Sequence, residues 1–292
     1  IGGCEDVSEI FSVDSSIVAI EPLPPTTQVV FHAINKSGSE ALSNLLFEAF
    51  RLNGRSSEFH SHFRIPVTQE QFIDYVNARR SDRGFFIDHY MYGSVRPWPN
   101  RTYLTQFRHP LSRLLSAYNW LKKIAERENS SFPEFKSFVE ESNGVYHSIV
   151  VQLGTNWHLF DTPDWRQRIE KLGAEGLYER SVEALEREIY AIGIAEYFEE
   201  SIFLYASLLR LAQVPPWQRD KRNEDRPLST EIDREVIELV EHINRWDYAL
   251  YALAQRRFHA QFIAPQASTA LKVYKDRCRG EYRDRLTLEV SD

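Results

Sequence analysis

Apolar residues change their spacing several times along the chain, and each change predicts a secondary-structure element. Residues 28–34 form a short apolar run with β-branched members, which predicts a buried strand. From Leu42 to Phe50 the apolar positions follow one helical face, and Asn53-Gly54 supplies a stop signal. The pattern therefore predicts a strand, a short polar loop and a helix in succession.

The same alternation continues along the chain. We expect, in order, a helix over 68–80, strands over 85–89 and 102–107, a helix from Pro110, a helix over 182–189, a strand over 191–195 and a helix over 201–211. A long helical segment, capped by Ser229 or Thr230, then runs to residue 262. This order predicts an α/β fold: a P-loop-like, mostly parallel central sheet flanked by helices, a long C-terminal helix, and ligands at the carboxyl ends of the strands.

A single domain accounts for most of the chain. Its 292 residues, 42% of them hydrophobic, are enough for a large core, and no repeat or linker divides them. Residues 1–27 end in a proline-rich turn and are expected to form an irregular lead-in. Residues 28–265 are expected to form the α/β domain, and residues 266–292 a C-terminal extension.

Charge and cysteine content disfavour several classes of protein. A net charge of −7 and an isoelectric point near 5.8 disfavour a nucleic-acid-binding surface. Two cysteines, Cys4 and Cys278, are too few for a disulfide framework and wrongly spaced for a zinc site, and we expect no metal. Neither a membrane span nor a signal peptide is recognisable. These features favour a cytoplasmic protein, with the lumenal domain of a truncated secretory-pathway enzyme as the alternative.

The first loop, Asn35-Lys36-Ser37-Gly38-Ser39, has the residue types of an anion-binding site. The peptide N–H groups and the dipole at a helix start both favour an anion. Gly38 allows close approach of the backbone, while Lys36 and the two serine hydroxyls add a cation and donors. The alternative is an ordinary polar turn with a solvated lysine. The loop is not a Walker A motif, because Lys36 precedes its only glycine.

A second candidate anion site follows the strand over 102–107. Arg108 ends that strand, and Ser116 lies on the second turn of the next helix, beside Arg113. Arg108 and Ser116 have the chemistry to hold a second phosphate. The alternative is that Arg108 and Arg113 pair with acidic side chains at the surface.

These segments resemble motifs of the sulfotransferases that use 3′-phosphoadenosine 5′-phosphosulfate (PAPS), especially the Golgi carbohydrate branch that contains heparan sulfate 2-O-sulfotransferase. In that family a lysine-containing loop after the first strand holds the 5′-phosphosulfate, and an Arg-(Asp)-Pro-x-x-Arg-x-x-Ser-x-Tyr segment holds the 3′-phosphate. The second motif reads here Arg108-His109-Pro110-Leu111-Ser112-Arg113-Leu114-Leu115-Ser116-Ala117-Tyr118. Weaker similarity extends over residues 28–262.

The resemblance implies a cofactor site and a reaction. The residues implied in PAPS binding are Lys36, Ser37, Gly38, Ser39, Glu40, Arg108 and Ser116. The implied reaction moves a sulfuryl group from PAPS to a hydroxyl or amine of a carbohydrate or small molecule and releases 3′-phosphoadenosine 5′-phosphate (PAP). Asn35 replaces a proline common in the family, and His109 replaces an aspartate, so the chain lies outside the best-known branches.

Sulfuryl transfer needs a base for the acceptor proton and a cation for the charge that develops on the leaving phosphate. Lys36 suits the second role. The branch resembled here uses a histidine at the end of the strand before the arginine strand, and His89 lies at the matching position. The ordinary pKa of histidine suits base catalysis near neutrality. Asp88 is the rival, because neighbouring strand residues face opposite ways and only one of the two can point into the cleft.

Other segments are weaker candidates. Trp157, His158 and Trp165 could line an acceptor pocket, although packing is the commoner role of such residues. The basic segment 219–226 could close over the nucleotide, with a solvated charge run as the alternative. Two other functions stay open: a nucleotide-dependent phosphotransferase with a non-standard loop, and a catalytically silent module that binds PAP or an acidic glycan.

Overall fold

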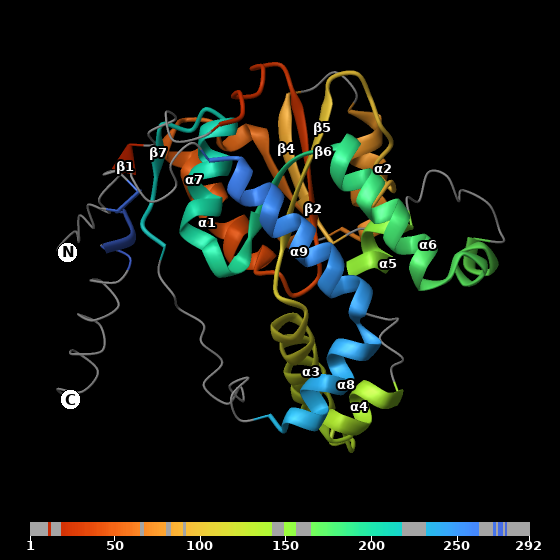
Figure 1. The fold of residues 1–292 in the computed structure, drawn as a ribbon. Coiled ribbons are helices and arrows are strands. Elements are labelled where there is room, and N and C mark those ends of the chain that lie inside the picture. The colour runs from red at the N-terminus through yellow and green to blue at the C-terminus, as the bar shows by residue number, and fades with distance from the viewer. Residues whose placement is uncertain are drawn as a thin grey trace, which may run out of the picture.

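Five parallel strands form the central sheet of the computed structural model (Figure 1). The structure describes residues 11–12, 19–64, 67–79, 83–89, 92–141, 149–155, 165–217, 232–262, 271–272, 274–276 and 278. The spatial order is β3-β4-β2-β5-β6, formed by β2 (Gln28–Ala33), β3 (Phe59–Ser61), β4 (Gly84–Asp88), β5 (Arg101–Phe107) and β6 (Ile189–Ile194). A separate antiparallel pair joins β1 (Phe11–Ser12) to β7 (Gln213–Val214). The predicted α/β class with a parallel sheet is confirmed.

Helices flank the sheet (Figure 1). They are α1 (Ser39–Leu52), α2 (Gln69–Ala78), α3 (Pro110–Arg127), α4 (Phe135–Glu141), α5 (Ile149–Gly154), α6 (Trp165–Arg187), α7 (Phe198–Leu208), α8 (Arg234–Ile243) and α9 (Arg245–Ala260). α1 and α7 pack together on one side, α5 and α6 pack together on the other, and α9 lies along β6. None of the helices in the described part of the chain has the length and apolar character of a membrane span.

The register of the sheet brings three strand ends to one edge. β2 pairs in parallel with both neighbours, so that His32 lies beside Asp88 of β4 and beside Thr105 of β5. All of β2 is buried, as expected for a parallel strand that is covered on both faces. We call the edge at which β2, β4 and β5 end the carboxyl edge, and the opposite one the amino edge.

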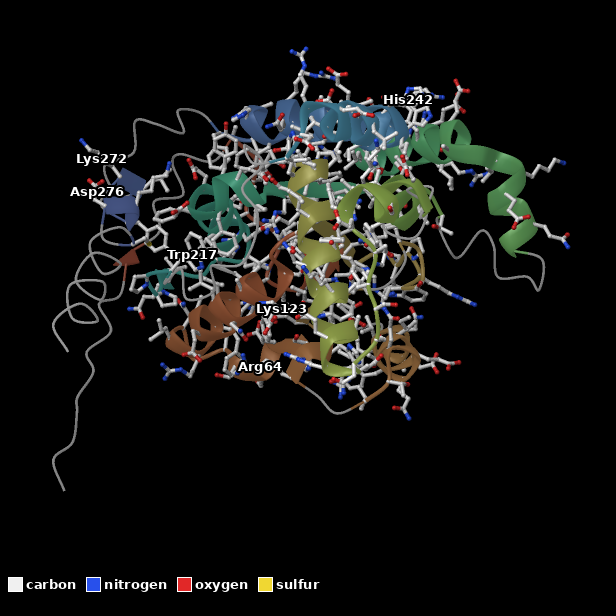
Figure 2. All side chains as sticks on the ribbon, turned by 90° about the horizontal axis from the view of Figure 1, so that it is seen from below. Arg64, Lys123, Trp217, His242, Lys272 and Asp276 are labelled. Carbon is white, nitrogen blue, oxygen red and sulfur yellow. The ribbon has the colours of Figure 1, made fainter. Side chains whose placement is uncertain are left out.

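A smaller helical lobe stands below the carboxyl edge in Figure 1. It consists of α3, α4 and α8, whose apolar side chains form a cluster separate from the main core: Leu111, Leu114, Leu115, Tyr118, Phe138, Val139 and Val240. The leucine stripe of the helix after Pro110 supplies one side of this cluster. Seen from below (Figure 2), His242 of α8 and Arg64 lie at opposite margins of the molecule. Helix α3 of this lobe begins at Pro110, directly after Arg108 and His109.

The C-terminal helical segment differs from the prediction. It is divided into α8 and α9, because the chain leaves helical geometry at Asn244, whose side-chain amide donates to the carbonyl of Val240 (3.0 Å). The predicted caps Ser229 and Thr230 lie outside the described residues. The spacing of apolar residues passes through this break unchanged, so the sequence pattern alone cannot reveal it.

Other boundaries also differ. Ile189 begins β6 instead of ending a helix, and α7 begins three residues earlier than predicted, at Phe198. The sequence does not predict β3, because three residues are too few to show a period. In the expected irregular lead-in, Phe11 and Ser12 form β1.

Candidate functional site

The loop between β2 and α1 has the backbone geometry of an anion cradle. Lys36 and Gly38 both have positive φ angles, 65° and 82°. A Cβ atom at Gly38 would also lie 3.4 Å from Nε2 of Gln106, so a glycine fits best. A lysine in this sparsely populated region costs conformational energy, so the surrounding structure must hold the loop in place.

The start of α1 supplies donors at this loop. The first intrahelical hydrogen bond runs from the N–H of Leu42 to the carbonyl of Gly38 (3.0 Å), so the N–H groups of the preceding turn have no carbonyl within the helix. Ser37 is 1% exposed, and its hydroxyl has no hydrogen-bond partner among the described residues. The hydroxyl of Ser39 donates back to the carbonyl of Ile34 (3.4 Å). Glu40 lies in the first turn and is exposed.

Two buried amide side chains hold the loop in place. Nε2 of Gln106 donates to the carbonyl of Ser37 (2.6 Å), and Oε1 of Gln152 on α5 accepts from the N–H of Asn35 (2.9 Å). The sequence analysis did not single out either glutamine. The sequence does contain a signal for such a residue, namely an amide side chain within an apolar segment that is expected to be buried. A buried amide needs a hydrogen-bond partner, so its presence indicates a specific contact.

Lys36 and Arg108 meet at the carboxyl edge, as the two motifs predicted. Nη1 of Arg108 donates to the carbonyl of Lys36 (3.1 Å). The ammonium of Lys36 lies 4.2 Å from the ring centroid of Trp120, an exposed residue of α3. Burial lowers the pKa of Lys36 and the charge of Arg108 lowers it further, while Glu40 raises it. Two cations are thus concentrated where the loop and the strand end meet.

Ser116 lies on the same helix as Trp120, one turn earlier and on the same face, and is half-buried. Arg113 is 1% exposed and pairs with the equally buried Asp247 of α9 (3.3 Å). The alternative of a surface ion pair is therefore wrong for Arg113, because both partners are buried where α9 packs against α3.

Asp247 connects three helices, α3, α5 and α9. Its oxygens accept from the N–H groups of Ile149 (2.8 Å) and Val150 (3.0 Å) at the start of α5 as well as from Arg113. The same short helix carries Gln152, which holds the loop. One chain of hydrogen bonds therefore links α3 to the loop that carries Lys36.

His109 has a packing role. Its ring contacts the rings of Tyr248 and Tyr251 edge to face at 5.3 and 5.5 Å, and the backbone N–H of His109 donates to Oε1 of Glu196 (3.0 Å). The residue that departs from the family motif is thus held against α9, while Pro110 occupies the first turn of α3 as predicted.

The two candidate bases lie at the end of β4 with different exposure. His89 is half-buried, and its Nδ1 lies 2.6 Å from the carbonyl oxygen of Ala33, so Nδ1 carries the hydrogen and Nε2 the lone pair of the neutral ring. Burial lowers the pKa of His89, and Lys36 and His62 lower it further. Asp88 is 1% exposed and contacts His62 (3.1 Å). Of the two side chains, that of His89 is the more accessible.

Several weaker candidates lie outside the described residues. These are Trp157, His158 and the segment 219–226. Trp165 is described only as the first residue of α6. In the part of the chain that the structure describes, no group of three or more histidine, cysteine or acidic side chains is arranged to hold a metal ion.

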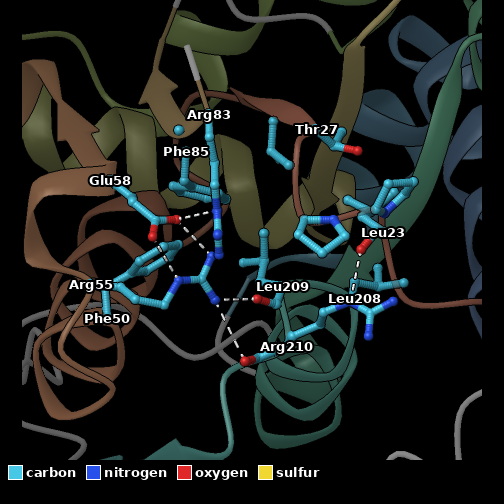
Figure 3. Close-up of a pocket in the computed structure, with 14 residues that line it drawn as sticks. Leu23, Thr27, Phe50, Arg55, Glu58, Arg83, Phe85, Leu208, Leu209 and Arg210 are labelled. Carbon is cyan, nitrogen blue, oxygen red and sulfur yellow. Dashed lines mark hydrogen bonds and ion pairs between the residues drawn. The ribbon is translucent and has the colours of Figure 1, made fainter.

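A pocket lies far from these residues, at the amino edge (Figure 3). Arg55 pairs with Glu58 through two hydrogen bonds (3.0 and 2.7 Å), and Arg83 pairs with the same carboxylate (2.6 Å). Arg210 donates to the carbonyl of Leu23 (3.0 Å). The charged groups of this pocket contact one another or the backbone.

The chain was compared with protein families, curated proteins and solved structures. No protein-family model matches the sequence, and no curated protein matches it significantly. Among solved structures, a sulfotransferase from Alicyclobacillus acidocaldarius is similar with 15% identity and a TM-score of 0.42, over 80% of this chain and 98% of that one. A match of this degree does not assign an activity to the chain.

Proposed function

We propose that the protein is a sulfotransferase that uses PAPS and a histidine base. The observation that carries the proposal is the meeting of the Lys36 loop with Arg108, whose guanidinium donates to the carbonyl of Lys36. PAPS has phosphate groups on both sides of its ribose, and the loop and the Arg108–Ser116 segment offer two adjacent anion-binding sites.

In this proposal each residue has a defined role. The loop and Lys36 bind the 5′-phosphosulfate, and Arg108 with Ser116 binds the 3′-phosphate. Nε2 of His89 removes the proton from an acceptor hydroxyl or amine. The acceptor atom forms a bond to sulfur while the bond from sulfur to the bridging phosphate oxygen breaks, and Lys36 stabilises the charge that PAP gains. The lowered pKa of His89 supports this role, because the ring is then neutral near pH 7.

The acceptor is proposed to be a carbohydrate or a small molecule with a hydroxyl or amine. An indole face beside Lys36, such as that of Trp120, can stack on a sugar ring or an aromatic ring. No metal has a role in this mechanism.

Calorimetric titration with PAP, and separately with ATP and magnesium, tests the donor site. We expect heat of binding and thermal stabilisation with PAP, and weaker effects with ATP. Stronger stabilisation by ATP with magnesium would favour a phosphotransferase and contradict the proposal. Transfer of labelled sulfuryl groups to a panel of acceptors tests the reaction. Binding of PAP without transfer to any acceptor would favour a silent binding module.

A further inference from the structure

His62 lies at the carboxyl edge, although it belongs to neither of the two sequence motifs. It follows the edge strand β3, which pairs in parallel with β4 so that Ser61 lies opposite Ile87. The next residues, His62 and Asp88, lie side by side, with Nδ1 of His62 3.1 Å from Oδ1 of Asp88. The sheet register therefore brings a second histidine to the residue that precedes His89.

Both ring nitrogens of His62 face oxygen atoms. Nε2 lies 2.8 Å from the carbonyl oxygen of Val67. A carbonyl oxygen can only accept, so Nε2 carries a hydrogen, and Nδ1 of a neutral ring would then present a lone pair to Asp88. The contact with Asp88 is a hydrogen bond only if one further proton is present, on Nδ1 or on the carboxyl group. The positions of these three groups are those of a histidine–carboxylate pair that shares one proton.

The surroundings of Asp88 favour this proton. Its side chain is 1% exposed, Oδ1 also accepts from the backbone N–H of His89 (2.6 Å), and Oδ2 has no hydrogen-bond partner among the described residues. Burial raises the pKa of Asp88, while the contacts with His89 and His62 lower it. An ionised carboxylate without a partner for one oxygen is costly when buried, and a shared proton reduces that cost.

The pair also affects His89 electrostatically. Burial is the main cause that lowers the pKa of His89. The charges of Lys36 and His62 lower it further, whereas the hydrogen bond to the backbone and the charge of Glu40 raise it. His32, the remaining histidine nearby, has its pKa lowered to about 3 by burial and is neutral near pH 7. A pair that lost its proton would carry a negative charge and would favour the protonated form of His89.

We propose that His62 is a positioning residue for His89. The proton that His62 shares with Asp88 leaves this pair without net charge. His89 beside it therefore stays neutral and able to accept a proton. The catalytic part of this statement rests on the proposed function. The shared proton does not rest on it, because its support is the position of His62 between Asp88 and the carbonyl of Val67 and the burial of Asp88.

Nitrogen-15 NMR of the histidine rings in the full chain, without ligand, tests the proposal from about pH 5 to about pH 9. We expect the wild type near pH 7 to show an extra proton on His62 or on the carboxyl of Asp88, and a neutral His89 with its hydrogen on Nδ1. In His62→Gln, which leaves Asp88 without a proton to share, the midpoint of the His89 titration should rise by about one pH unit.

His60→Gln is the matched control. His60 lies on β3, the strand that His62 follows, but its Nδ1 contacts the hydroxyl of Tyr75 (3.1 Å) and its ring stacks on Phe86. The control should leave the midpoint of His89 in place. A neutral His62 beside an ionised Asp88 in the wild type would overturn the proposal, as would a midpoint of His89 that is the same in both variants.

Asp88→Asn provides a second test if His62→Gln does not fold. The amide oxygen can still accept from the N–H of His89, but the group cannot share a proton, so His62 should show one protonated nitrogen near pH 7. An extra proton that stays on His62 would overturn the proposal.

Titration of the same samples with PAP separates the shared proton from the proposed function. Absence of PAP binding in the wild type would contradict the sulfotransferase function and leave the shared proton intact.

Discussion

The two edges of the sheet use cationic side chains in different ways. At the amino edge, Arg55 and Arg83 share the carboxylate of Glu58, and none of the residues lining this pocket has a buried side-chain polar atom without a partner (Figure 3). At the carboxyl edge, Lys36 contacts an indole ring and Arg108 a peptide carbonyl. Buried polar atoms that lack hydrogen-bond partners within the described part of the chain include, at this edge, Ser37 Oγ, Asp88 Oδ2 and Gln106 Oε1.

This difference is the one expected between a structural cluster and the proposed binding site. Polar atoms that are buried without partners are rare in folded proteins and call for an explanation, such as an absent ligand. Arginines that already bind a carboxylate and the backbone need no such explanation. The comparison therefore predicts that changes at the carboxyl edge affect ligand binding, while changes at the amino edge affect only stability.

Lys36→Ala should have the largest effect on binding. Loss of a charged hydrogen bond to the 5′-phosphosulfate position should weaken PAP binding by about 100-fold, because charge-assisted bonds contribute about 1.5–3 kcal/mol. Arg83→Ala removes a cation at the amino edge and is the control. Calorimetry should show unchanged PAP affinity for this control. Equal losses in the two variants would mean that net charge, and not the site, binds PAP.

Acid should destabilise the carboxyl edge through His32. The folded protein lowers the pKa of His32 to about 3, so the unfolded chain binds more protons between this value and the ordinary histidine pKa of about 6.5. Stability contributed by neutral His32 is thus complete above pH 6.5 and is lost as the pH falls. The slope from this group is about 1.4 kcal/mol per pH unit. In denaturant unfolding, the free energy of unfolding of His32→Gln should change less steeply with pH than that of the wild type. His242→Gln, which changes an exposed histidine, should show the same pH dependence as the wild type.

Gly38→Ala and Gly54→Ala separate backbone strain from ligand binding. Both glycines have positive φ, but Cβ would meet Gln106 at Gly38 and open space at Gly54. Each change should lower the free energy of unfolding by about 1 kcal/mol. Only Gly38→Ala should also weaken PAP binding, by about fivefold for a cost near 1 kcal/mol. Unchanged affinity in Gly38→Ala would mean that the loop does not approach the nucleotide.

Arg55→Gln should leave the affinity for PAP unchanged. It removes two hydrogen bonds to Glu58 and one to the carbonyl of Leu209, so unfolding should require about 1 kcal/mol less. Arg51→Gln is the control, because its ion pair with Glu48 is largely exposed and should contribute little. A change in PAP affinity in Arg55→Gln would contradict the distinction between the edges.

The sequence predicts the carboxyl edge in outline. Strand spacing and parallel topology are enough to bring the Lys36 loop, His89 and Arg108 to one edge, because parallel strands end together. Apolar periodicity also predicts α1 and α3, including the stop at Asn53 and the proline at the start of α3.

The supporting residues could not be predicted in the same way. Gln106, Gln152, His62 and Asp247 act through contacts between segments that are distant in the sequence, and periodicity contains no information about such contacts. For Arg113, helical spacing predicts the face of the helix on which the residue lies, but not that α9 packs against this face. The break at Asn244 depends on a local side-chain hydrogen bond that leaves the apolar pattern unchanged.

The central claim is that the carboxyl edge holds two phosphate groups of one nucleotide, with Arg108 at the second. Calorimetric titration of the wild type and of Arg108→Ala with PAP and with adenosine 5′-monophosphate, which lacks the 3′-phosphate, tests this claim most directly. The wild type should bind PAP at least about tenfold more tightly than the monophosphate, and Arg108→Ala should abolish that advantage. Equal affinities in the wild type, or an advantage that survives in Arg108→Ala, would contradict the account.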